Sequence, residues 1–282
     1  MTLSGKARVA GVMGWPVGHS RSPRLHGYWL EQYGIDGAYV PLPVKPESLG
    51  RALAALPALG FAGVNLTLPH KEAALKFLAR IDRMAERIGA VNTVTVEPDG
   101  ALVGSNTDAF GFIENLKAGA PQWRAGDGPA LVLGAGGAAR AVGVALLEAG
   151  APEIRIANRT HDRAQALAAA LDPRCQAVGW SDRGKSLKSI NLLVNTTSLG
   201  MAGQPPLDLD LSQLPPSAIV NDIVYVPLET ALLAAARKRG NPVVDGLGML
   251  LHQGRPGFKA WFGVDPDVTA GLRRALVEDL VR

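Results

Sequence analysis

Cysteine is nearly absent from this chain of 282 residues, which contains only Cys175. A single thiol cannot form an intrachain disulfide, so we expect a protein of the reducing cytoplasm, with Cys175 as a small packed side chain. Long apolar runs are also missing, since none reaches the roughly 20 residues that span a membrane. The first residues lack the apolar core of a signal peptide. We therefore expect a soluble protein with no membrane partner.

Aromatic residues are scarce, at 5% of the chain, and the basic residues are scattered rather than clustered. Because a base-stacking surface needs both kinds of side chain together, the sequence does not favour a nucleic-acid partner. The formal net charge of +4 suits an anionic small ligand. Apolar residues, at 47%, supply enough core for one large domain or two modest ones. No metal site is predicted.

What the chain does contain is an apolar strand pattern, residues 130–133, that stops at a glycine cluster. The cluster is Gly134-Ala135-Gly136-Gly137-Ala138, and an alanine-rich helical pattern follows it. The first glycine permits a sharp turn, the second leaves room for a phosphate, and the third lets the helix pack close to the strand. The helix N-terminus then offers free N–H groups to a pyrophosphate. This order predicts a dinucleotide site rather than a plain turn.

Strand and helix patterns alternate from residue 130 onward, as a doubly wound parallel sheet requires. The predicted fold class is α/β, with an N-terminal α/β domain and a Rossmann-type doubly wound parallel-sheet domain. Helical patterns after residue 246 exceed what the second domain needs, and we expect them to pack back on the N-terminal half. The predicted strands are 130–134, 153–158, 175–179, 191–195, 218–222 and 241–245, and the predicted helices are 137–149, 161–170 and 228–239.

The residue that ends the second strand of such a fold distinguishes NAD from NADP. NAD binders usually place Asp or Glu there, whereas this strand ends in Asn158-Arg159-Thr160, with Arg163 one turn further on. A guanidinium fork matches a 2′-phosphate with bidentate geometry, and a threonine hydroxyl adds a donor. The alternative is a solvated arginine beside a helix start. With the glycine cluster upstream, the sequence favours NADP(H).

Polar residues of the N-terminal half each allow two interpretations. Ser20 and Ser22 precede a predicted helix that starts at Pro23, so they either cap the helix or receive a carboxylate. Lys71 begins a helix just after a strand, where a cation is disfavoured, and it is either a surface charge or a catalytic group. Asp108 is either a favourable first-turn carboxylate, which the spacing alone prefers, or a functional one.

Several motifs, taken in their joint order, make the chain resemble the shikimate dehydrogenase family over nearly its full length. The resemblance implies a reversible reduction of 3-dehydroshikimate to shikimate by NADPH. Besides the glycine cluster, the motifs are GWP at 14–16 with HSRSP at 19–23, NLTLPHK at 65–71, GAVNT at 89–93, NTD at 106–108, NRT at 158–160, NTTSLGM at 195–201, DIVY at 222–225 and GLGMLLHQ at 246–253.

The resemblance also implies roles for individual residues. Lys71 and Asp108 would form the catalytic pair beside the reacting oxygen, and Ser20 and Ser22 would hold the substrate carboxylate. The residues expected to contact the ring hydroxyls or the carboxylate are Thr67, Asn92, Tyr225 and Gln253. The expected cofactor-binding residues are Gly134, Ala135, Gly136, Gly137, Ala138, Asn158, Arg159, Thr160, Arg163, Thr196, Ser198, Met201, Gly246 and Met249.

The resemblance places substrate binding and catalysis in residues 1–107 and 247–282, and NADP binding in residues 108–246. We expect a small-molecule substrate and a monomer or homodimer. One alternative is a quinate/shikimate dehydrogenase of broader substrate or NAD use, against whose NAD-using form Arg159 and Arg163 argue. A more distant alternative is a non-catalytic nucleotide-binding sensor, for which the catalytic pair would have no purpose.

Two positions depart from the family pattern. Gly27 stands where the family usually has asparagine, so one polar contact near the substrate is expected to be absent. Pro256 and Gly257 interrupt the helical pattern after Gln253, and a proline there is expected to kink the helix.

Overall fold

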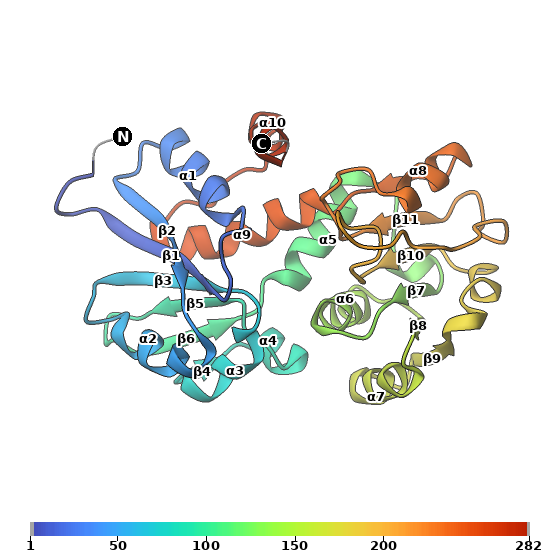
Figure 1. The fold of residues 1–282 in the computed structure, drawn as a ribbon, viewed down its shortest axis with the longest axis horizontal. Coiled ribbons are helices and arrows are strands. Elements are labelled where there is room, and N and C mark those ends of the chain that lie inside the picture. The colour runs from blue at the N-terminus through green and yellow to red at the C-terminus, as the bar shows by residue number, and fades with distance from the viewer. Residues whose placement is uncertain (1–2, 281–282) are drawn as a thin grey trace. The chain divides into compact units, whose positions relative to one another are not determined.

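The computed structural model describes residues 3–280, which form two compact units (Figure 1). Unit 1 contains the chain up to Thr107 and again from Gln253 onward, and unit 2 contains Asp108–His252. The sequence placed the return to the first domain at residue 247, whereas the structure groups residues 247–252 with unit 2. The expectation that the last helices pack on the N-terminal half is confirmed for the chain from Gln253 onward.

Unit 1 is built on a mixed sheet with the strand order β2-β1-β3-β5-β6-β4. The strands β1, β2 and β3 are parallel, and β5 runs antiparallel to β3 and β6. The antiparallel pair β5–β6 is a hairpin whose turn contains Pro98-Asp99-Gly100. The strands are β1 (Arg8–Gly14), β2 (Gly37–Pro43), β3 (Phe61–Leu66), β4 (Arg80–Ile81), β5 (Thr93–Val96) and β6 (Leu102–Ser105).

An aliphatic layer covers one face of this sheet, where Leu49 and Leu53 pack against Val64, Leu66 and Val91. The elements near this layer are η1 (Pro46–Ser48), α2 (Leu49–Ala55), α3 (His70–Ala73), η2 (Ala74–Phe77) and α4 (Arg83–Ile88).

Aromatic side chains from α1 (Ser22–Gln32) and α9 (Leu247–Phe262) form a second layer of unit 1. Trp261 of α9 donates its indole N–H to the carbonyl of Val94 at 3.1 Å. A Cβ at Gly63 would lie 2.2 Å from that indole nitrogen, so only glycine lets α9 approach the sheet this closely.

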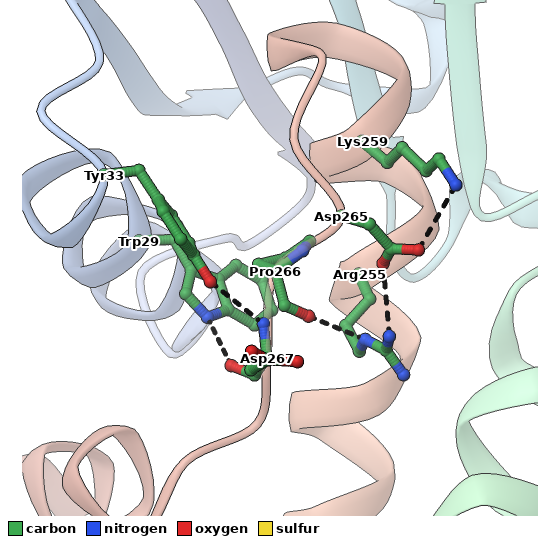
Figure 2. A network of polar contacts seen from close by, with 7 residues as sticks. All are labelled: Trp29, Tyr33, Arg255, Lys259, Asp265, Pro266 and Asp267. Carbon is green, nitrogen blue, oxygen red and sulfur yellow. Dashed lines mark hydrogen bonds and ion pairs between the residues drawn. The ribbon is translucent and has the colours of Figure 1, made fainter.

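The segment 265–267 makes polar contacts with α1 and α9 in unit 1 (Figure 2). Asp265 accepts from Arg255 and Lys259 of α9, both at 3.2 Å, and Trp29 of α1 donates to the carbonyl of Asp267 at 3.1 Å. These contacts precede α10 (Ala270–Leu280). Pro256 lies inside α9, so the helix runs through the proline at which the sequence predicts a kink.

Unit 2 is an all-parallel sheet with the strand order β12-β11-β10-β7-β8-β9. Read from the other edge, this is the 3-2-1-4-5-6 order of a doubly wound dinucleotide-binding fold, so the predicted fold class is confirmed. The strands are β7 (Ala130–Leu133), β8 (Ile154–Asn158), β9 (Cys175–Gly179), β10 (Leu192–Asn195), β11 (Ile219–Asp222) and β12 (Val243–Val244).

The helices of unit 2 include one close to each of the three predicted positions. They are α5 (Asp108–Gly119), α6 (Gly137–Glu148), α7 (His161–Leu171) and α8 (Ala231–Lys238), with the short 3₁₀ helices η3 (Ala125–Asp127), η4 (Trp180–Asp182) and η5 (Lys185–Leu187). Leucines of α8 and of the segment 187–214 pack against Leu131, Leu193 and Val220 of the sheet. Within residues 3–280, every helix is too short or too polar to cross a membrane.

Candidate active site and nucleotide-binding site

The turn after β7 requires glycine for two separate reasons. Gly134 has a φ of 113°, in the region that side chains disfavour, and a Cβ there would lie 2.5 Å from the hydroxyl oxygen of Thr196. That hydroxyl donates to the carbonyl of Leu133 at 2.6 Å, and the Thr196 N–H donates to the same carbonyl at 2.9 Å. The turn is therefore bonded to the residue that follows the neighbouring strand β10.

Helix α6 begins at Gly137 with Gly136 as its N-cap residue, and no side chain among the described residues makes a cap hydrogen bond there. A Cβ added at either glycine would meet no atom within 4 Å, so the backbone faces open space. An uncapped helix N-terminus with room beside it is suited to an anionic phosphate. Ala135 and Ala138, on either side of these glycines, are partly buried. The predicted pyrophosphate contacts thus fit the backbone that the structure presents.

Two arginines follow β8, Arg159 directly and Arg163 in the first turn of α7. Asn158 is held by a hydrogen bond from its side-chain amide to the carbonyl of Thr160 at 2.9 Å, while Arg159, Thr160 and Arg163 are exposed. The Arg163 N–H donates to the Thr160 carbonyl at 3.1 Å in the first turn of α7. Two exposed guanidinium groups near one helix start can bind a doubly charged group such as a 2′-phosphate.

The loop after β10 is wound around the side chain of Asn195. The Asn195 carbonyl oxygen accepts from the N–H and the hydroxyl of Thr197, at 3.1 and 2.7 Å, and its amide donates to the Leu199 carbonyl at 3.1 Å. Ser198 and Met201, two predicted cofactor contacts on this loop, are exposed, the latter at 40%.

The segment that enters α9 is held close to the end of β11. Gly246 packs so tightly there that a Cβ would lie 2.3 Å from the carbonyl oxygen of Ile223. Met249, the other predicted cofactor contact of this segment, is half-buried in the first turn of α9. Tyr225, a predicted substrate contact, is half-buried three residues after β11.

In unit 1, the two serines lie side by side at the start of α1. The hydroxyl of Ser20 accepts from the N–H of Ser22 at 3.3 Å, so it does satisfy one N-terminal N–H group. Arg21 is the N-cap residue, and it makes no side-chain cap hydrogen bond. The side chain of Arg21 instead forms an ion pair with Asp279 of α10 at 2.7 Å. Helix capping therefore accounts for part of what the serines do and leaves the carboxylate interpretation open.

Asn92 and Gln253, predicted from far apart in the sequence, belong to one group of side chains linked by hydrogen bonds. The Asn92 amide donates to the Thr107 hydroxyl at 3.0 Å and to the Gln253 carbonyl oxygen at 3.5 Å. The Asn92 carbonyl oxygen accepts from the Thr107 N–H at 2.9 Å. Beneath it, the Asn65 amide donates to the Asn92 backbone carbonyl at 3.0 Å, and Tyr39 donates to the Asn65 side chain at 2.6 Å.

Thr67 and Lys71 stand at the end of β3 and the start of α3. Both are half-buried. The backbone holds this turn, because the Thr67 carbonyl accepts from His70 at 2.9 Å and the Lys71 carbonyl accepts from Val91 at 2.8 Å. Asp108, half-buried at the first position of α5, belongs to unit 2. The pairing of Lys71 with Asp108 stays a prediction.

Sequence reasoning assigned no role to three buried residues that the structure places among the predicted ones: Asn65, Asn195 and Asp222. Each is a polar side chain inside or at the end of a buried strand, and this was a signal that could have found them. Asp222 accepts hydrogen bonds from Asn195, Val224 and Thr230. Burial raises the pKa of the Asp222 carboxyl to about 6, against the opposing effect of these donors.

Fold and site together define a two-unit α/β protein in which one unit has the architecture of dinucleotide-dependent oxidoreductases. Three family models match: the shikimate dehydrogenase substrate-binding domain at residues 12–94, shikimate/quinate 5-dehydrogenase at 122–201, and the shikimate 5′-dehydrogenase C-terminal domain at 246–276. The chain belongs to the shikimate dehydrogenase family, which confirms the resemblance seen in the sequence.

Relatives match nearly the whole of the chain. The chain is 64% identical to a shikimate dehydrogenase (NADP(+)) of Rhodospirillum rubrum, over 98% of this chain and 99% of the relative. Shikimate 5-dehydrogenase from Thermus thermophilus, solved with NADP(H) and shikimate, superposes with a TM-score of 0.85 at 42% identity, covering 97% and 99% of the two chains. Quinate dehydrogenase from Corynebacterium glutamicum, solved with NAD, gives 0.90 at 32% identity, covering 96% and 99%.

Proposed function

We propose that this protein is an NADP-dependent shikimate dehydrogenase that catalyses the reversible reduction of 3-dehydroshikimate to shikimate, a step of chorismate and aromatic amino acid biosynthesis. The observation that carries the proposal is the 64% identity, over 98% of this chain, to a protein named shikimate dehydrogenase (NADP(+)). The glycine turn of unit 2, with its open helix N-terminus, supports the dinucleotide part of the assignment.

The proposed chemistry divides between the two units. Unit 2, principally residues 108–246, holds NADP(H), which supplies or accepts the hydride when bound. Unit 1 holds the substrate: Ser20 and Ser22 receive the carboxylate, and the side-chain amides of buried Asn92 and half-buried Gln253 present donors and acceptors to ring hydroxyls. Thr67 of unit 1 and Tyr225, which belongs to unit 2, complete these contacts.

Lys71 and Asp108 assist the proton transfer. As the substrate carbonyl carbon gains a hydride, negative charge develops on its oxygen, and the Lys71 ammonium donates a proton to that oxygen. The Asp108 carboxylate orients the ammonium and takes part in the proton transfer that restores the charge of Lys71. In the oxidation direction the pair accepts the hydroxyl proton instead. A polar pocket of this kind rejects substrates that lack a ring hydroxyl, since its buried groups would be left unpaired.

The preference for NADP rests on the end of β8. Asn158 stands where an NAD site usually has a carboxylate, and Arg159 and Arg163 are exposed beside the start of α7. A charge-assisted hydrogen bond of about 1.5–3 kcal/mol corresponds to roughly 10- to 100-fold in affinity. The Arg159→Ala variant is expected to lose about this much of its preference for NADP+ over NAD+, whereas Arg237→Ala, at an exposed arginine of α8, is expected to keep it.

One assay tests the proposal against its nearest alternative. The kcat/KM values are measured for shikimate and quinate, each with NADP+ and NAD+. We expect the shikimate–NADP+ pair to be the most efficient. Higher efficiency with quinate, or with NAD+, would instead assign the protein as a quinate/shikimate dehydrogenase. This alternative is chosen because the chain is similar to quinate dehydrogenase from Corynebacterium glutamicum, which was solved with NAD.

We further infer a cytoplasmic protein that acts as a monomer or homodimer on small molecules. The single cysteine supports a reducing compartment.

A further inference from the structure

Three strands of unit 2 end in one row of residues directly beneath the glycine turn. Asn195 of β10 is in register with Leu133 of β7 on one side and with Asp222 of β11 on the other. Asn195 and Asp222 are both fully buried. In a doubly wound sheet the ligand lies beyond the carboxyl ends of these strands, at the point where the strand order reverses between β7 and β10. Side chains in this row therefore underlie the loops that meet the dinucleotide.

Both oxygens of the Asp222 carboxylate are used as acceptors. Oδ1 accepts from the Asn195 side-chain amide at 2.9 Å and from the Val224 N–H at 3.0 Å, and Oδ2 accepts from the Thr230 hydroxyl at 2.7 Å. The Thr230 oxygen in turn accepts from Leu233 and caps helix α8. One carboxylate thus holds the end of β10, the segment after β11 and the start of α8.

The carboxylate also decides which way the Asn195 amide faces. An ionised carboxylate only accepts hydrogen bonds, so the Asn195 nitrogen must point at Asp222 and its oxygen must point at the loop. That oxygen accepts from both the N–H and the hydroxyl of Thr197, whose own oxygen accepts from the Leu199 N–H at 3.1 Å. If the amide were reversed, a nitrogen would face the Thr197 N–H. The conformation of residues 196–199 therefore depends on the orientation of Asn195.

Asp222 also organises the segment that leads to Tyr225. The bond to the Val224 N–H fixes the turn after β11, and the Val226 carbonyl accepts from the Ala202 N–H at 2.8 Å. This last bond joins the segment 223–226 to the end of the loop that contains Met201. Displacement of Asp222 would loosen both segments together.

We propose that Asp222 is a positioning residue of the reaction: through Asn195 and Val224 it holds the 196–201 loop and the Tyr225 segment in the geometry that hydride transfer requires. The proposal rests on the proposed function, because it takes these two segments to contact the nicotinamide and the substrate. It assigns Asp222 to the nicotinamide half of the site, which the sheet order places on the β10–β11 side, and not to the adenosine half at β7 and β8.

The test separates the two halves of the nucleotide site. Asp222→Ala leaves three donors without their acceptor, and a reacting group displaced by about 1 Å costs on the order of 100-fold in rate. We expect kcat to fall by about this factor and the KM for NADP+ to rise, while the Kd of adenosine 2′,5′-bisphosphate, measured by calorimetry, stays unchanged. Asp222→Asn, which keeps an acceptor for Asn195 and Val224 and turns its amide toward Thr230, is expected to recover most of the kcat.

The matched control is Asp210→Ala. Asp210 is an exposed aspartate of the same unit that accepts two bonds from Ser212, and its removal is expected to change neither kcat nor KM. If Asp222→Ala does not fold, Thr197→Val decides the question, since it removes only the hydroxyl that links Asn195 to the loop. Thr197→Val is expected to shift kcat and the KM for NADP+ in the same direction, again with unchanged binding of adenosine 2′,5′-bisphosphate.

Two outcomes would overturn the proposal. In one, folded Asp222→Ala retains the wild-type kcat and KM for NADP+. In the other, its affinity for adenosine 2′,5′-bisphosphate falls in parallel with that for NADP+, which is the pattern of a general loss of structure. Failure of the proposed function would be seen separately, as wild-type protein that does not oxidise shikimate with NADP+. The binding comparison of NADP+ with adenosine 2′,5′-bisphosphate would then still test the placement of Asp222.

Discussion

The polar groups that are buried near the predicted sites differ between the two units. Unit 1 surrounds its predicted substrate residues with neutral side chains: Asn65, Asn92 and Thr93 are buried and bonded to one another. Unit 2 buries an ionisable carboxyl, Asp222, at the carboxyl end of its sheet. A neutral network can be satisfied by pairing amides and hydroxyls, whereas a buried carboxylate also loses its hydration. The comparison shows that the group which holds the loops of unit 2 loses more hydration free energy on burial than the neutral groups of unit 1.

Each unit also contains buried groups whose pKa is shifted toward the neutral form. In unit 1, His26 stacks on Tyr39 with 4.0 Å between ring centroids, and burial lowers its pKa to about 3. In unit 2, burial raises the pKa of Asp222 to about 6. A base held neutral and an acid held neutral respond to pH with opposite signs. Stability measured against pH therefore distinguishes the two units.

The largest expected effect separates chemistry from nucleotide binding. Lys71→Ala in unit 1 removes the proposed proton donor, and loss of general acid–base assistance lowers the rate by about 10²- to 10⁴-fold. We expect kcat for shikimate oxidation to fall in this range, while the Kd of NADP+ measured by calorimetry and the circular dichroism spectrum stay unchanged. Asp108→Asn is expected to lower kcat as well. Wild-type turnover by Lys71→Ala would favour the non-catalytic sensor.

The next effect concerns the acid stability of unit 1. The pKa of His26 is about 3 in the folded protein and about 6.5 in the unfolded chain. Its contribution is therefore fully present above pH 6.5 and is lost as the pH falls toward 3. At about 1.4 kcal/mol per pH unit, wild type should lose about 2 kcal/mol of unfolding free energy between pH 6.5 and 5 through this residue.

His26→Phe removes the titrating group and keeps an aromatic ring. Urea unfolding at pH 5 and 6.5 is expected to show a smaller loss of stability on acidification than in wild type. His161→Gln, at an exposed histidine of α7, is the control and is expected to behave like wild type. Equal pH dependence in wild type and His26→Phe would show that His26 is not held neutral.

A smaller effect of opposite sign is expected in unit 2. The pKa of Asp222 is raised from 3.8 to about 6 in the folded protein, so its contribution to stability is fully present below pH 3.8 and is lost as the pH rises through 6. Asp222→Asn does not titrate. Its unfolding free energy relative to wild type should rise by about 1 kcal/mol between pH 5 and 7. A difference that stays constant over this range would contradict the raised pKa.

The smallest effect concerns the ion pair between Arg21 and Asp279, which joins α1 to α10 in unit 1. Both side chains are partly exposed, at 33% and 25%, and pairs of this kind contribute about 0.2–1 kcal/mol. A double-mutant cycle with Arg21→Gln and Asp279→Asn should give a coupling free energy in this range at low salt. The coupling should shrink in 1 M salt, because ions screen exposed charges. Coupling that is independent of salt would show that the pair is effectively buried.

Particular residues show which features of the fold could be predicted from the sequence. The turn at Gly134 and the start of α6 at Gly137 were predictable, because a strand, a glycine cluster and a helix follow one another directly along the chain. Helix α9 runs through Pro256 to Phe262, and the kink expected at this proline stays a prediction. The family was recognised from motifs in order, and the comparisons confirm it.

The contacts of Asp222 could not be predicted in the same way. The DIVY motif marked the position, but its partner Asn195 lies 27 residues earlier, and the two meet only because β10 and β11 are neighbours in register. Asn92 and Gln253 are 161 residues apart and are joined by the return of α9 to unit 1.

The sequence by itself determined the order of strands, glycines and helices, the class of fold and the family, because these depend on short-range periodicity and on residue types at fixed spacing. Only the tertiary structure decided that Asn195 faces Asp222 and that Asn92 faces Gln253. The reason is geometric: a hydrogen bond needs two atoms within about 3 Å, and for residues far apart in the chain that distance is set by strand order, register and helix packing.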